Sequence, residues 1–481
     1  MPVTHHSPLC EVGIDLVANK MAPWGWALLG LAMLLYRYCI GLWPHSGEGD
    51  PPMYGDYEAQ RHWMEVTTAL PVGDWYRHTA QNDLQYWGLD YPPLTAFASY
   101  ACGRVGLLVE PAAMALGTSR GHETPASRTF MRLTVIFVDL VIYFPACYLV
   151  VWSYYGHRAR RRSLTWPRRY EAVGLLLVQP ALLLIDHGHF QYNQVSLGFM
   201  LLAVAAFGRH RYYLTAIMFC GALNFKQISL FYALAFFFTL LSSSIHSAPR
   251  GFGHAARRVM CLGAVVVVVF ALHFLPFCVW SAPGETCAQG MGHVLSRVFP
   301  FNRGLFEDKV SNVWCVLDPV LKLRRVFAGN TGALKAMSAG ATLLLCTPSI
   351  VALLRTAPSV RSLVYALTST SLAFFLCGFQ VHEKSILFPV ASASVLILEE
   401  PRVVTMFVMT ATFSMFPLLS RDGLVVPYMV TMLAFFGFAW GIVPVSPLVE
   451  SLSLSSTSPS TKDMPDHAAR SNANTPVSSP A

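Results

Sequence analysis

Long apolar runs recur along the 481-residue chain, and they constrain its fold more than any other feature. Crossing a bilayer takes about 20 apolar residues. Runs of about this length lie at 24–43, 129–152, 259–280, 331–354, 361–379, 402–418 and 424–446. Such runs favour helices, because backbone polar groups inside a membrane must pair within one segment, and a barrel would need short alternating strands. Hydrophobic residues make up 54% of the chain and charged residues only 12%, which excludes a soluble enzyme, a disordered chain and a single-pass receptor. The predicted fold class is an all-α polytopic membrane protein.

Shorter apolar runs of about 14 residues are expected to thin the bilayer or to be shielded by neighbouring helices. They lie at 172–185, 194–207, 212–224, 228–241 and 385–398. With the longer runs they predict 11 to 14 transmembrane helices. Residues 1–23 are too polar for a signal peptide and are expected to be a cytoplasmic N-terminus. The Ser- and Pro-rich residues 448–481 are expected to be a disordered cytoplasmic tail.

Basic clusters set the predicted orientation. They occur at 157–162, which reads HRARRR, at 168–169, 209–211 and 250–258, and at Arg355 and Arg361. By the positive-inside rule these clusters are cytoplasmic, so this reading of the net charge of +8 is favoured over nucleic-acid binding. The opposite side then carries residues 44–127, 186–193, 224–227, 281–312 and 381–385. Successive spans place all the basic clusters on the cytoplasmic side only if residues 91–108 and 313–326 do not cross the membrane completely. These two segments are therefore expected to lie along the membrane or to dip into it. Lys322, Arg324 and Arg325 are then a local exception to the rule.

This orientation divides the chain into a first transmembrane module, 24–280, with a large loop at 44–127, and a second, 281–447, with a loop at 281–312. Three cysteines, Cys278, Cys287 and Cys315, flank the second loop and could pair if it faces an oxidising lumen. There is no CxxC pair and no ligand-like Cys and His spacing, so neither a zinc site nor a redox motif is indicated.

Five short polar segments gather on the predicted non-cytoplasmic side, where charged side chains are costly without a partner or a task. The first, GDYEAQRHW at 55–63, contains Asp56 and Glu58, either of which could act as a general base beside a cavity. The alternative for Glu58 and Arg61, which are three residues apart, is a surface ion pair. In the second segment, 85–93, two prolines present Asp90 from a stiff loop. Its aromatic residues suit either an interfacial belt or stacking on a sugar.

The other three segments supply histidines and cations. DHGHFQYN at 186–193 could bind a metal, but hydrogen bonding at a helix end is favoured because no fourth ligand is evident. The fourth and fifth segments, 299–310 and 382–384, contribute Arg303, Lys309, His382 and Lys384. We interpret these as cations that could bind a phosphate, although each alone could be an interfacial charge beside an acidic neighbour. Together the five segments indicate a polar cavity covered by the long loop.

Several of these segments resemble the endoplasmic-reticulum α-1,3-glucosyltransferases of asparagine-linked glycan assembly, which use dolichyl phosphate glucose. The resemblance covers roughly residues 24–440, and it is closest to the branch that adds the first glucose to the lipid-linked oligosaccharide. The segments are GDYEAQRHW at 55–63, QYWGLDYPPLTAF at 85–97, TSRG at 118–121, DHGHFQYN at 186–193, FKQ at 225–227, RGLFEDKV at 303–310 and VHEKSIL at 381–387.

The resemblance implies a GT-C membrane fold whose first luminal loop contains membrane-parallel helices, and an active site on the luminal side. It also implies that Asp56 is the base that activates the acceptor, that Asp90 is a second loop acid and that His382 lies near the donor phosphate. Residues at the family's motif positions are expected to bind substrate, with roles left open: Glu58, Arg61, Arg303, Lys309 and Lys384.

The expected chemistry is transfer of glucose from β-linked dolichyl phosphate glucose into an α linkage, which inverts the anomeric centre. One carboxylate is enough, because a departing phosphate needs no general acid and cations can stabilise its charge. No DxD-type pair occurs in the polar segments, so metal-independent transfer without a cofactor is expected. The expected partners are the donor, the dolichyl-pyrophosphate-linked oligosaccharide and the bilayer, and the oligomeric state is left open. Three alternatives remain: a second-glucose or mannosyl-donor relative, a lipid-linked sugar flippase or other transporter, and an inactive scaffold.

Overall fold

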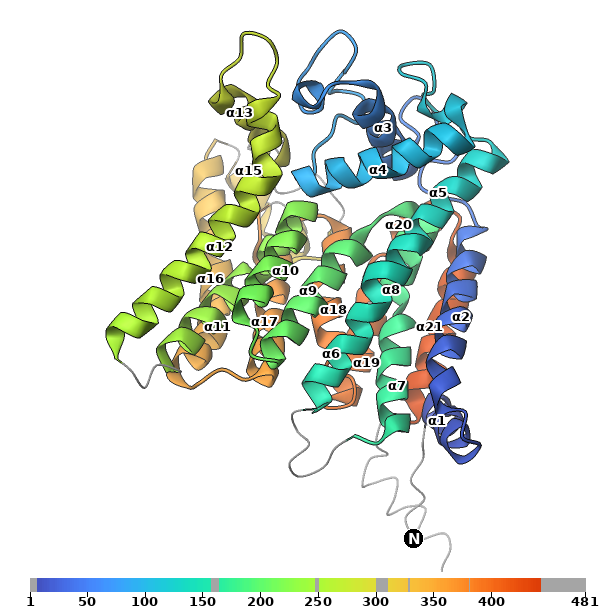
Figure 1. The fold of residues 1–481 in the computed structure, drawn as a ribbon, viewed down its shortest axis with the longest axis vertical. Helices are drawn as coiled ribbons and strands as arrows, with labels where there is room; N and C mark the ends of the chain where they lie inside the picture. The colour runs from blue at the N-terminus through green and yellow to red at the C-terminus, as the bar shows by residue number, and fades with distance from the viewer. Residues whose placement is uncertain are drawn as a thin grey trace, which may run out of the picture. The chain divides into compact units, whose positions relative to one another are not determined.

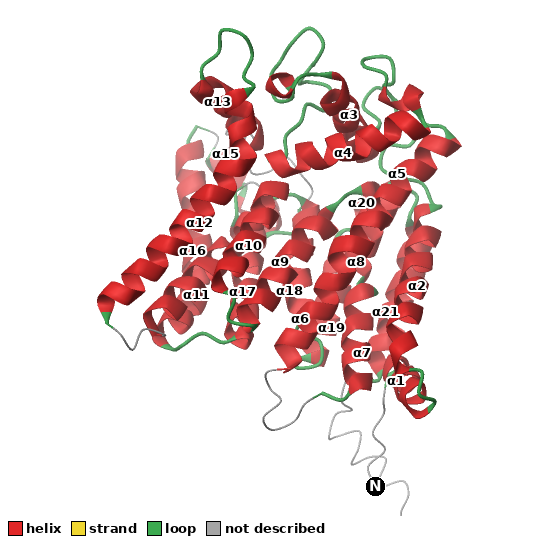
Figure 2. Cartoon of the chain, in the orientation of Figure 1, coloured by secondary structure: helices red, strands yellow, loops and turns green. Residues whose placement is uncertain are grey.

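The computed structural model describes residues 7–156, 164–246, 251–299, 310–327, 329–379 and 381–442. Helices dominate these ranges, and no strand occurs within them (Figures 1 and 2), which confirms the all-α class. Two residues expected to bind substrate, Arg303 and Lys309, lie outside the described residues, as does the tail at 448–481.

The helices of the N-terminal segment and of the first module begin at residue 8. They are α1 (Pro8–Ala18), α2 (Ala22–Gly41), α3 (Gly55–Ala69), α4 (Pro93–Val109), α5 (Pro125–Val138), α6 (Phe144–Gly156), α7 (Trp166–Leu177), α8 (Pro180–Leu182), α9 (Asn193–Gly208), α10 (Tyr212–Phe225), α11 (Ala233–His246) and α12 (Phe252–Val279). Short 3-10 or π segments connect or extend them: η1 (Val72–Asp74), η2 (Pro111–Met114), η3 (Asp139–Tyr143), η5 (Leu183–Phe190) and η6 (Gln227–Tyr232).

Helices of the second module follow a short loop after α12. They are α13 (Cys287–Val298), α14 (Val313–Leu321), α15 (Leu323–Val326), α16 (Thr331–Arg355), α17 (Val360–Cys377), α18 (Leu387–Ser394), α19 (Pro401–Ser414), α20 (Phe416–Arg421) and α21 (Val425–Trp440), with the 3-10 segment η7 (Glu383–Ile386) before α18. The helices of the two predicted modules pack directly together, because α16 and α17 contact α11.

Six helical stretches in the described ranges are long and apolar enough to cross a membrane: Pro125–Gly156, Trp166–Phe190, Gln227–His246, Phe252–Val279, Thr331–Arg355 and Val360–Cys377. Four shorter helices are also apolar: Pro93–Val109, Asn193–Gly208, Tyr212–Phe225 and Val425–Trp440. The total of 11 to 14 spans stays a prediction. The run at 172–185 lies within the stretch Trp166–Phe190, whose last part is the π-helical η5. The apolar window of this stretch is fully buried, which confirms the expectation that neighbouring helices shield it.

Helix α4 lies across the ends of the more upright helices, beside α3 (Figure 1). Close packing of α3 on α4 depends on Gly103, since a Cβ there would lie 2.8 Å from the carbonyl oxygen of Met64. Residues 313–326 form two short helices, α14 and α15, which are separated by Lys322 in a left-handed conformation (φ 49°). This geometry agrees with the prediction that 91–108 and 313–326 do not cross as regular spans.

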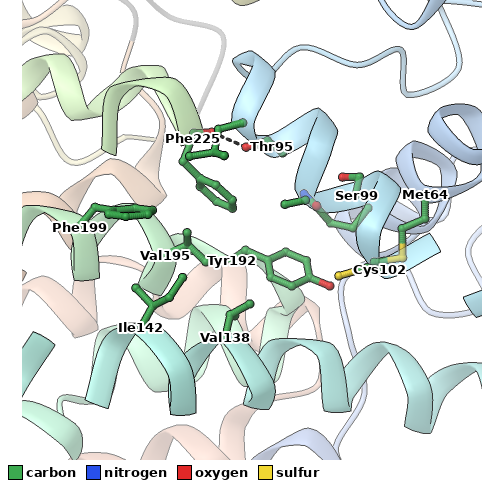
Figure 3. Close-up of a pocket in the computed structure, with 13 residues that line it drawn as sticks. Met64, Thr95, Ser99, Cys102, Val138, Ile142, Tyr192, Val195, Phe199 and Phe225 are labelled. Atoms are coloured by element: carbon green, nitrogen blue, oxygen red, sulfur yellow. Dashed lines mark hydrogen bonds between the residues drawn. The ribbon is translucent and has the colours of Figure 1, made fainter. Parts of the chain in front are cut away.

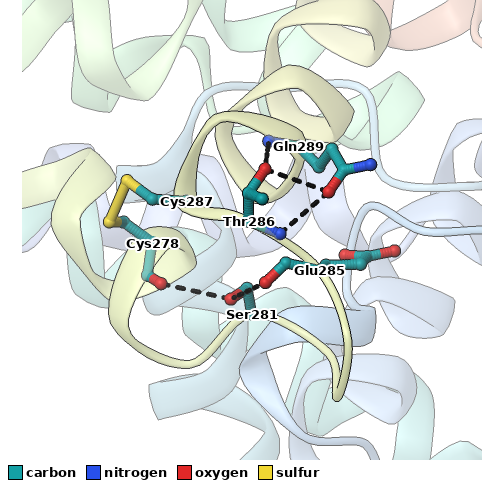
Figure 4. The surroundings of a disulfide bond; sticks show 6 residues. All are labelled: Cys278, Ser281, Glu285, Thr286, Cys287 and Gln289. Atoms are coloured by element: carbon teal, nitrogen blue, oxygen red, sulfur yellow. Dashed lines mark hydrogen bonds between the residues drawn. A yellow bond between two sulfur atoms is a disulfide. The ribbon is translucent and has the colours of Figure 1, made fainter.

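A disulfide joins Cys278 at the end of α12 to Cys287 at the start of α13 (Figure 4). It closes the short loop in which Thr286 caps α13 through a capping box with Gln289. Two of the three candidate cysteines therefore pair, while Cys315 lies in α14.

The N-terminal segment contains the helix α1, which was not predicted because the segment is polar. Ser7 caps α1 by accepting a hydrogen bond from the backbone N–H of Cys10 at 3.2 Å. The apolar side chains of Leu9 and Leu16 are buried, and α1 packs against α7.

Candidate active site

Two segments approach closely to place Asp56 at the start of α3. Tyr54 adopts a left-handed conformation (φ 58°) and Gly55 follows with φ 69°. A Cβ on Gly55 would lie 2.5 Å from the carbonyl oxygen of Ser46, so only glycine fits. The hydroxyl of Ser46 accepts a hydrogen bond from the backbone N–H of Asp56 at 3.3 Å. The loop before α3 therefore holds this carboxylate in place through backbone contacts.

Three side chains from distant segments converge on one oxygen of Asp56. The ammonium of Lys384 and the side-chain amide of Gln191 donate hydrogen bonds to Oδ2. The Nε2 atom of His189 lies 2.9 Å from the same oxygen. The other oxygen, Oδ1, accepts no hydrogen bond from the described part of the chain, and the side chain retains 20% exposure. Oδ1 is thus the oxygen that can receive a proton from a substrate.

The backbone conformation of Phe190 allows its two neighbours, His189 and Gln191, to reach the same oxygen of Asp56. Phe190 is the last residue of the π-helical η5 and has a positive φ of 88°, a strained conformation for a non-glycine residue. Its ring is fully buried and packs edge-on against Tyr57, the residue after Asp56. Because the chain turns sharply at this residue, His189 and Gln191 both face Asp56. Backbone strain and π-helical segments are common at functional sites.

His189 links Asp56 to a second buried carboxylate. Its Nδ1 atom is hydrogen-bonded to Asp422, which is 6% exposed and follows α20. A partner on Nδ1 fixes the orientation of an imidazole ring and therefore the direction in which Nε2 points. Asp422 was not recognised from the sequence, where it stands as an isolated acid in the turn RDG between two apolar runs.

The charge of Asp56 reflects two opposing effects. Burial raises the pKa of this carboxyl, but the positive charge of Lys384 and the contact with His189 outweigh burial and hold the pKa well below its usual value. Asp56 is therefore ionised near neutral pH. A general base must be ionised, although a neighbouring ammonium also reduces its affinity for a proton.

A second cation, Lys226, lies behind Gln191. Its ammonium donates to the side-chain oxygen of Gln191 at 2.9 Å and to that of Asn193 at 2.5 Å. Asn193 in turn donates to Asp186 at 2.6 Å. Asp186 also accepts from the backbone N–H of Gln194 at the start of α9. These contacts confirm the preference for hydrogen bonding at a helix end in the DHGHFQYN segment. Lys226 also adds a positive charge to the site, and in the sequence it stood out only as part of the FKQ motif.

The two remaining loop residues lie at the edges of this cluster. The backbone oxygen of Asp90 accepts from Gln227 at 3.1 Å, which ties the second polar segment to η6 beside Lys226. His382 caps η7, two residues before Lys384. Burial and the nearby charge of Lys384 lower the pKa of His382 to about 3. Its description as a cation was therefore wrong: it is a neutral imidazole near neutral pH and can offer a phosphate only a hydrogen bond.

Glu58 and Arg61 belong to a separate, fully buried network. Arg61 donates to Glu58 at 2.6 Å and to Glu65 at 2.8 Å. It also donates to Ser119 at 2.6 Å, and Glu58 accepts from Tyr86 at 2.8 Å. The pair is 1% or less exposed, so the alternative of a surface ion pair was wrong. These contacts attach α3 to two loops and do not involve the residues around Asp56, so substrate binding by Glu58 and Arg61 stays a prediction.

An apolar cavity of about 160 Å³ lies beside α3, one helical turn after Asp56 (Figure 3). Gln60 and Met64 of α3, residues of α4 and the apolar faces of α9 and α10 line it. Tyr192 points into the cavity next to Cys102, and the hydroxyl of Thr95 is bonded to the carbonyl oxygen of Phe225 at its edge (Figure 3). An apolar lining of this kind suits a hydrocarbon chain better than a sugar.

Comparison with known proteins places this geometry among related enzymes. A family model described as the ALG6, ALG8 glycosyltransferase family matches residues 29–471, which begins slightly later than the predicted range of 24–440 and extends further toward the C-terminus. The chain is 44% identical over 413 residues to the dolichyl pyrophosphate Man9GlcNAc2 alpha-1,3-glucosyltransferase of Gallus gallus, covering 85% of this chain and 78% of the relative.

Two further relatives carry a similar description. The probable enzyme of that name from Dictyostelium discoideum is 41% identical over 410 residues, covering 85% of this chain and 76% of the relative. The Saccharomyces cerevisiae enzyme is 40% identical over 413 residues, covering 84% and 72%. The similarity therefore extends over all the segments that meet at Asp56.

Proposed function

Since the chain belongs to the ALG6, ALG8 glycosyltransferase family, we propose that it transfers glucose from dolichyl phosphate glucose in α-1,3 linkage, with inversion. The proposed acceptor is the dolichyl-pyrophosphate-linked high-mannose oligosaccharide, and the proposed product carries the first glucose. The names of the relatives, which specify a Man9GlcNAc2 acceptor and an α-1,3 linkage, support this choice.

The observation that carries the proposal is the asymmetric environment of Asp56. Lys384 and Gln191 donate to Oδ2 and the Nε2 atom of His189 contacts it, while Oδ1 accepts no hydrogen bond from the described residues. An inverting transfer needs one ionised carboxylate that removes the proton of the acceptor hydroxyl as that oxygen attacks the anomeric carbon. Oδ1 of Asp56 has the charge and the access for this step, and the contacts on Oδ2 prevent the carboxylate from rotating away.

We assign the donor phosphate to the side of Asp56 on which the cations lie. Lys384 and Lys226 supply positive charge, and His382 supplies a neutral hydrogen-bond donor. Negative charge grows on the phosphate as it leaves, so preorganised cations stabilise the transition state more than the ground state. Arg303 and Lys309 remain proposed ligands of the same phosphate. These cations make a metal unnecessary for the step, and we propose metal-independent transfer.

We assign the apolar cavity beside α3 to the dolichyl chain of the donor. Tyr192 and Phe225 of its lining are the sequence neighbours of Gln191 and Lys226, so a chain in the cavity leads toward the cationic side of Asp56. An uncharged hydrocarbon gains free energy when it leaves water for such a lining.

The proposed location is the endoplasmic-reticulum membrane, with the active site facing the lumen. The acceptor named for the relatives belongs to N-glycan precursor assembly. The disulfide between Cys278 and Cys287 lies at the same end of the helices as α3 and α4 (Figure 1), and it supports an oxidising compartment on that side.

Transfer in vitro tests the proposal. The purified full-length protein is incubated with dolichyl phosphate glucose or dolichyl phosphate mannose, and with lipid-linked oligosaccharides that carry no glucose or one. We expect transfer only from the glucose donor and only to the unglucosylated acceptor. Transfer to the monoglucosylated acceptor alone would identify a second-glucose enzyme. Movement of the lipid-linked sugar across a vesicle without transfer would identify a flippase, and neither activity would leave the scaffold alternative.

A further inference from the structure

A second cluster of polar side chains lies in the loop that precedes α3, apart from the contacts of Asp56. Among the described residues, one group of three histidine or acidic side chains brings potential metal ligands together: His45, Glu48 and Glu123, whose ligand atoms lie within 4.8 Å of one another. His45 and Glu48 flank a tight turn, and Glu123 comes from the loop before α5.

Two acceptor atoms face each other in this cluster without a partner. The Nε2 atom of His45 and the Oε1 atom of Glu123 are 3.9 Å apart, which is too far for a hydrogen bond. Both atoms are buried, and neither makes a hydrogen bond. The His45 side chain is only 1% exposed, so solvent cannot satisfy it. A buried, unpaired polar atom is costly and calls for an explanation such as a bound ion or water.

The contact of the second ring nitrogen of His45, Nδ1, shows that Nε2 bears the lone pair. The Nδ1 atom lies 3.3 Å from the carbonyl oxygen of Ser46, and a carbonyl can only accept. Nδ1 must therefore carry the hydrogen, which leaves a lone pair on Nε2. The ring is held in this orientation by stacking on Tyr57, at 4.0 Å between the centroids. Metal-binding histidines commonly donate their second N–H to a backbone carbonyl in this way.

Glu48 is the third potential ligand and lies on the more exposed side of the cluster. Its carboxylate accepts hydrogen bonds from Arg128 at 2.6 Å and 3.1 Å, and it remains 30% exposed. Carboxylate oxygens have two lone pairs each, so Glu48 can hold Arg128 and a cation together, and carboxylate ligands are usually hydrogen-bonded in this manner.

We propose that His45, Glu48 and Glu123 bind one divalent cation in a structural site, with Zn²⁺ as the best match. One imidazole nitrogen and two carboxylate oxygens form a ligand set that suits zinc, and water can complete a tetrahedral coordination. The cation would occupy the space between Nε2 of His45 and Oε1 of Glu123 and would satisfy both atoms.

Such a cation would stabilise the loop that positions the catalytic base, without taking part in glucose transfer. His45 precedes Ser46, whose hydroxyl binds the backbone N–H of Asp56 and whose own N–H donates to the carbonyl oxygen of His189 at 3.0 Å. Joining residues 45–48 to Glu123 would fix both contacts. The proposal is compatible with metal-independent transfer, because the cation would not contact the reacting atoms.

Metal content and thermal stability of the purified full-length protein test the site. The protein is supplied with Zn²⁺, dialysed against metal-depleted buffer and measured by mass spectrometry of its metals. We expect one zinc ion per chain in the wild type and loss of that ion in H45Q and E123Q. The matched control is E110Q. Glu110 is 21% exposed and faces His122 at 3.5 Å, but no third ligand joins this pair among the residues that the structure describes, so E110Q should retain the zinc.

A second measurement keeps the test valid if a variant fails to fold. Chelation should lower the melting temperature of the wild type and of E110Q, and returning Zn²⁺ should restore it, since a ligand that binds only the native state stabilises it. The proposal is overturned if the wild type holds no metal after exposure to zinc, or if H45Q and E123Q keep the same zinc content as the wild type. A buried water between the two acceptors would account for the first of these results.

Discussion

The Nε2 atom of His189 lies 2.9 Å from Oδ2 of Asp56, at a separation of 133 residues in the sequence. The opposite nitrogen of the ring is hydrogen-bonded to Asp422, so one imidazole connects the proposed base to a buried carboxylate in the turn after α20. This arrangement, together with Lys384, gives Asp56 one restrained oxygen and one accessible oxygen. The predictions below follow from it and from the packing around it.

Replacing the proposed base should abolish transfer while leaving the fold intact. In Asp56→Asn the amide keeps the shape of the side chain but cannot accept a proton, and a positioned base contributes about 10²- to 10⁴-fold to the rate. We expect a loss of this size in kcat, measured with dolichyl phosphate glucose and the unglucosylated acceptor. Asp50→Asn, in the exposed part of the preceding loop, is the control and should retain activity. Near-normal turnover by Asp56→Asn would rule out the assignment.

Removing the ammonium that contacts Asp56 should shift the pH dependence. Burial raises the pKa of Asp56 and Lys384 lowers it, so Lys384→Gln removes the main lowering effect and the pKa must rise. The carboxylate will then take up its proton at a higher pH as the solution is acidified. We expect the acid limb of kcat/KM to move to higher pH than in the wild type. The exposed Lys20→Gln is the control. An unchanged acid limb would show that Lys384 does not act on the base.

The orienting carboxylate should affect turnover more than binding. In Asp422→Asn the His189 ring loses its charged partner, so the ring nitrogen that contacts Oδ2 of Asp56 becomes less well placed. Misplacement of catalytic groups costs roughly 10- to 100-fold in rate. We expect kcat to fall within this range and KM to change little. Arg421→Gln removes only the exposed partner of Asp422, a side chain that is 71% exposed and 3.8 Å away, and should cost much less. A rise in KM with normal kcat would assign Asp422 to substrate binding instead.

The buried network of α3 should contribute mainly to stability. Burial raises the pKa of Glu65, but the hydrogen bond with His62 and the charge of Arg61 bring it down to about 2, so Glu65 is ionised when α3 is folded. Arg61→Met would leave two buried carboxylates without their cation, at a cost of about 3–5 kcal/mol. Thermal unfolding in nanodiscs should show a large decrease. Arg77→Met, which breaks a pair that is 31% exposed, should show a much smaller one. If Arg61→Met unfolds as the wild type does, the network is not structural.

Filling the apolar cavity should discriminate between donors by chain length. Ser99→Phe places a ring in the cavity lined by α4 and α9 and should raise KM about tenfold, or ~1.4 kcal/mol, for a long-chain dolichyl donor. A donor whose lipid is too short to reach the cavity should be less affected. Val105→Phe, at a site on α4 that is 52% exposed, is the control. An equal effect on both donors would place the dolichyl chain elsewhere.

Individual segments show which structural features a local sequence pattern can predict. The apolar runs predicted where most of the long helices lie, since hydrophobic length is a local property. The apolar run at 172–185 ends before Asp186, and nothing local shows that helical structure continues through Asp186 and His187 as a π-helical segment. The burial of Glu58 and Arg61 could not be predicted either, since their spacing is the same for a surface pair and for a buried network.

By itself, the sequence determined that this chain is a helical membrane protein, which end of its helices carries the polar segments, and that Asp56 is the candidate base. Each of these conclusions depends on composition, charge or motif within one stretch of chain. Only the tertiary structure decided that Gln191, Lys384 and His189 share one oxygen of that base, that Asp422 supports His189, and that His45 faces Glu123. These relationships join residues up to 328 positions apart. No local pattern records them, because they arise when the packing of apolar helices brings the ends of separate helices together.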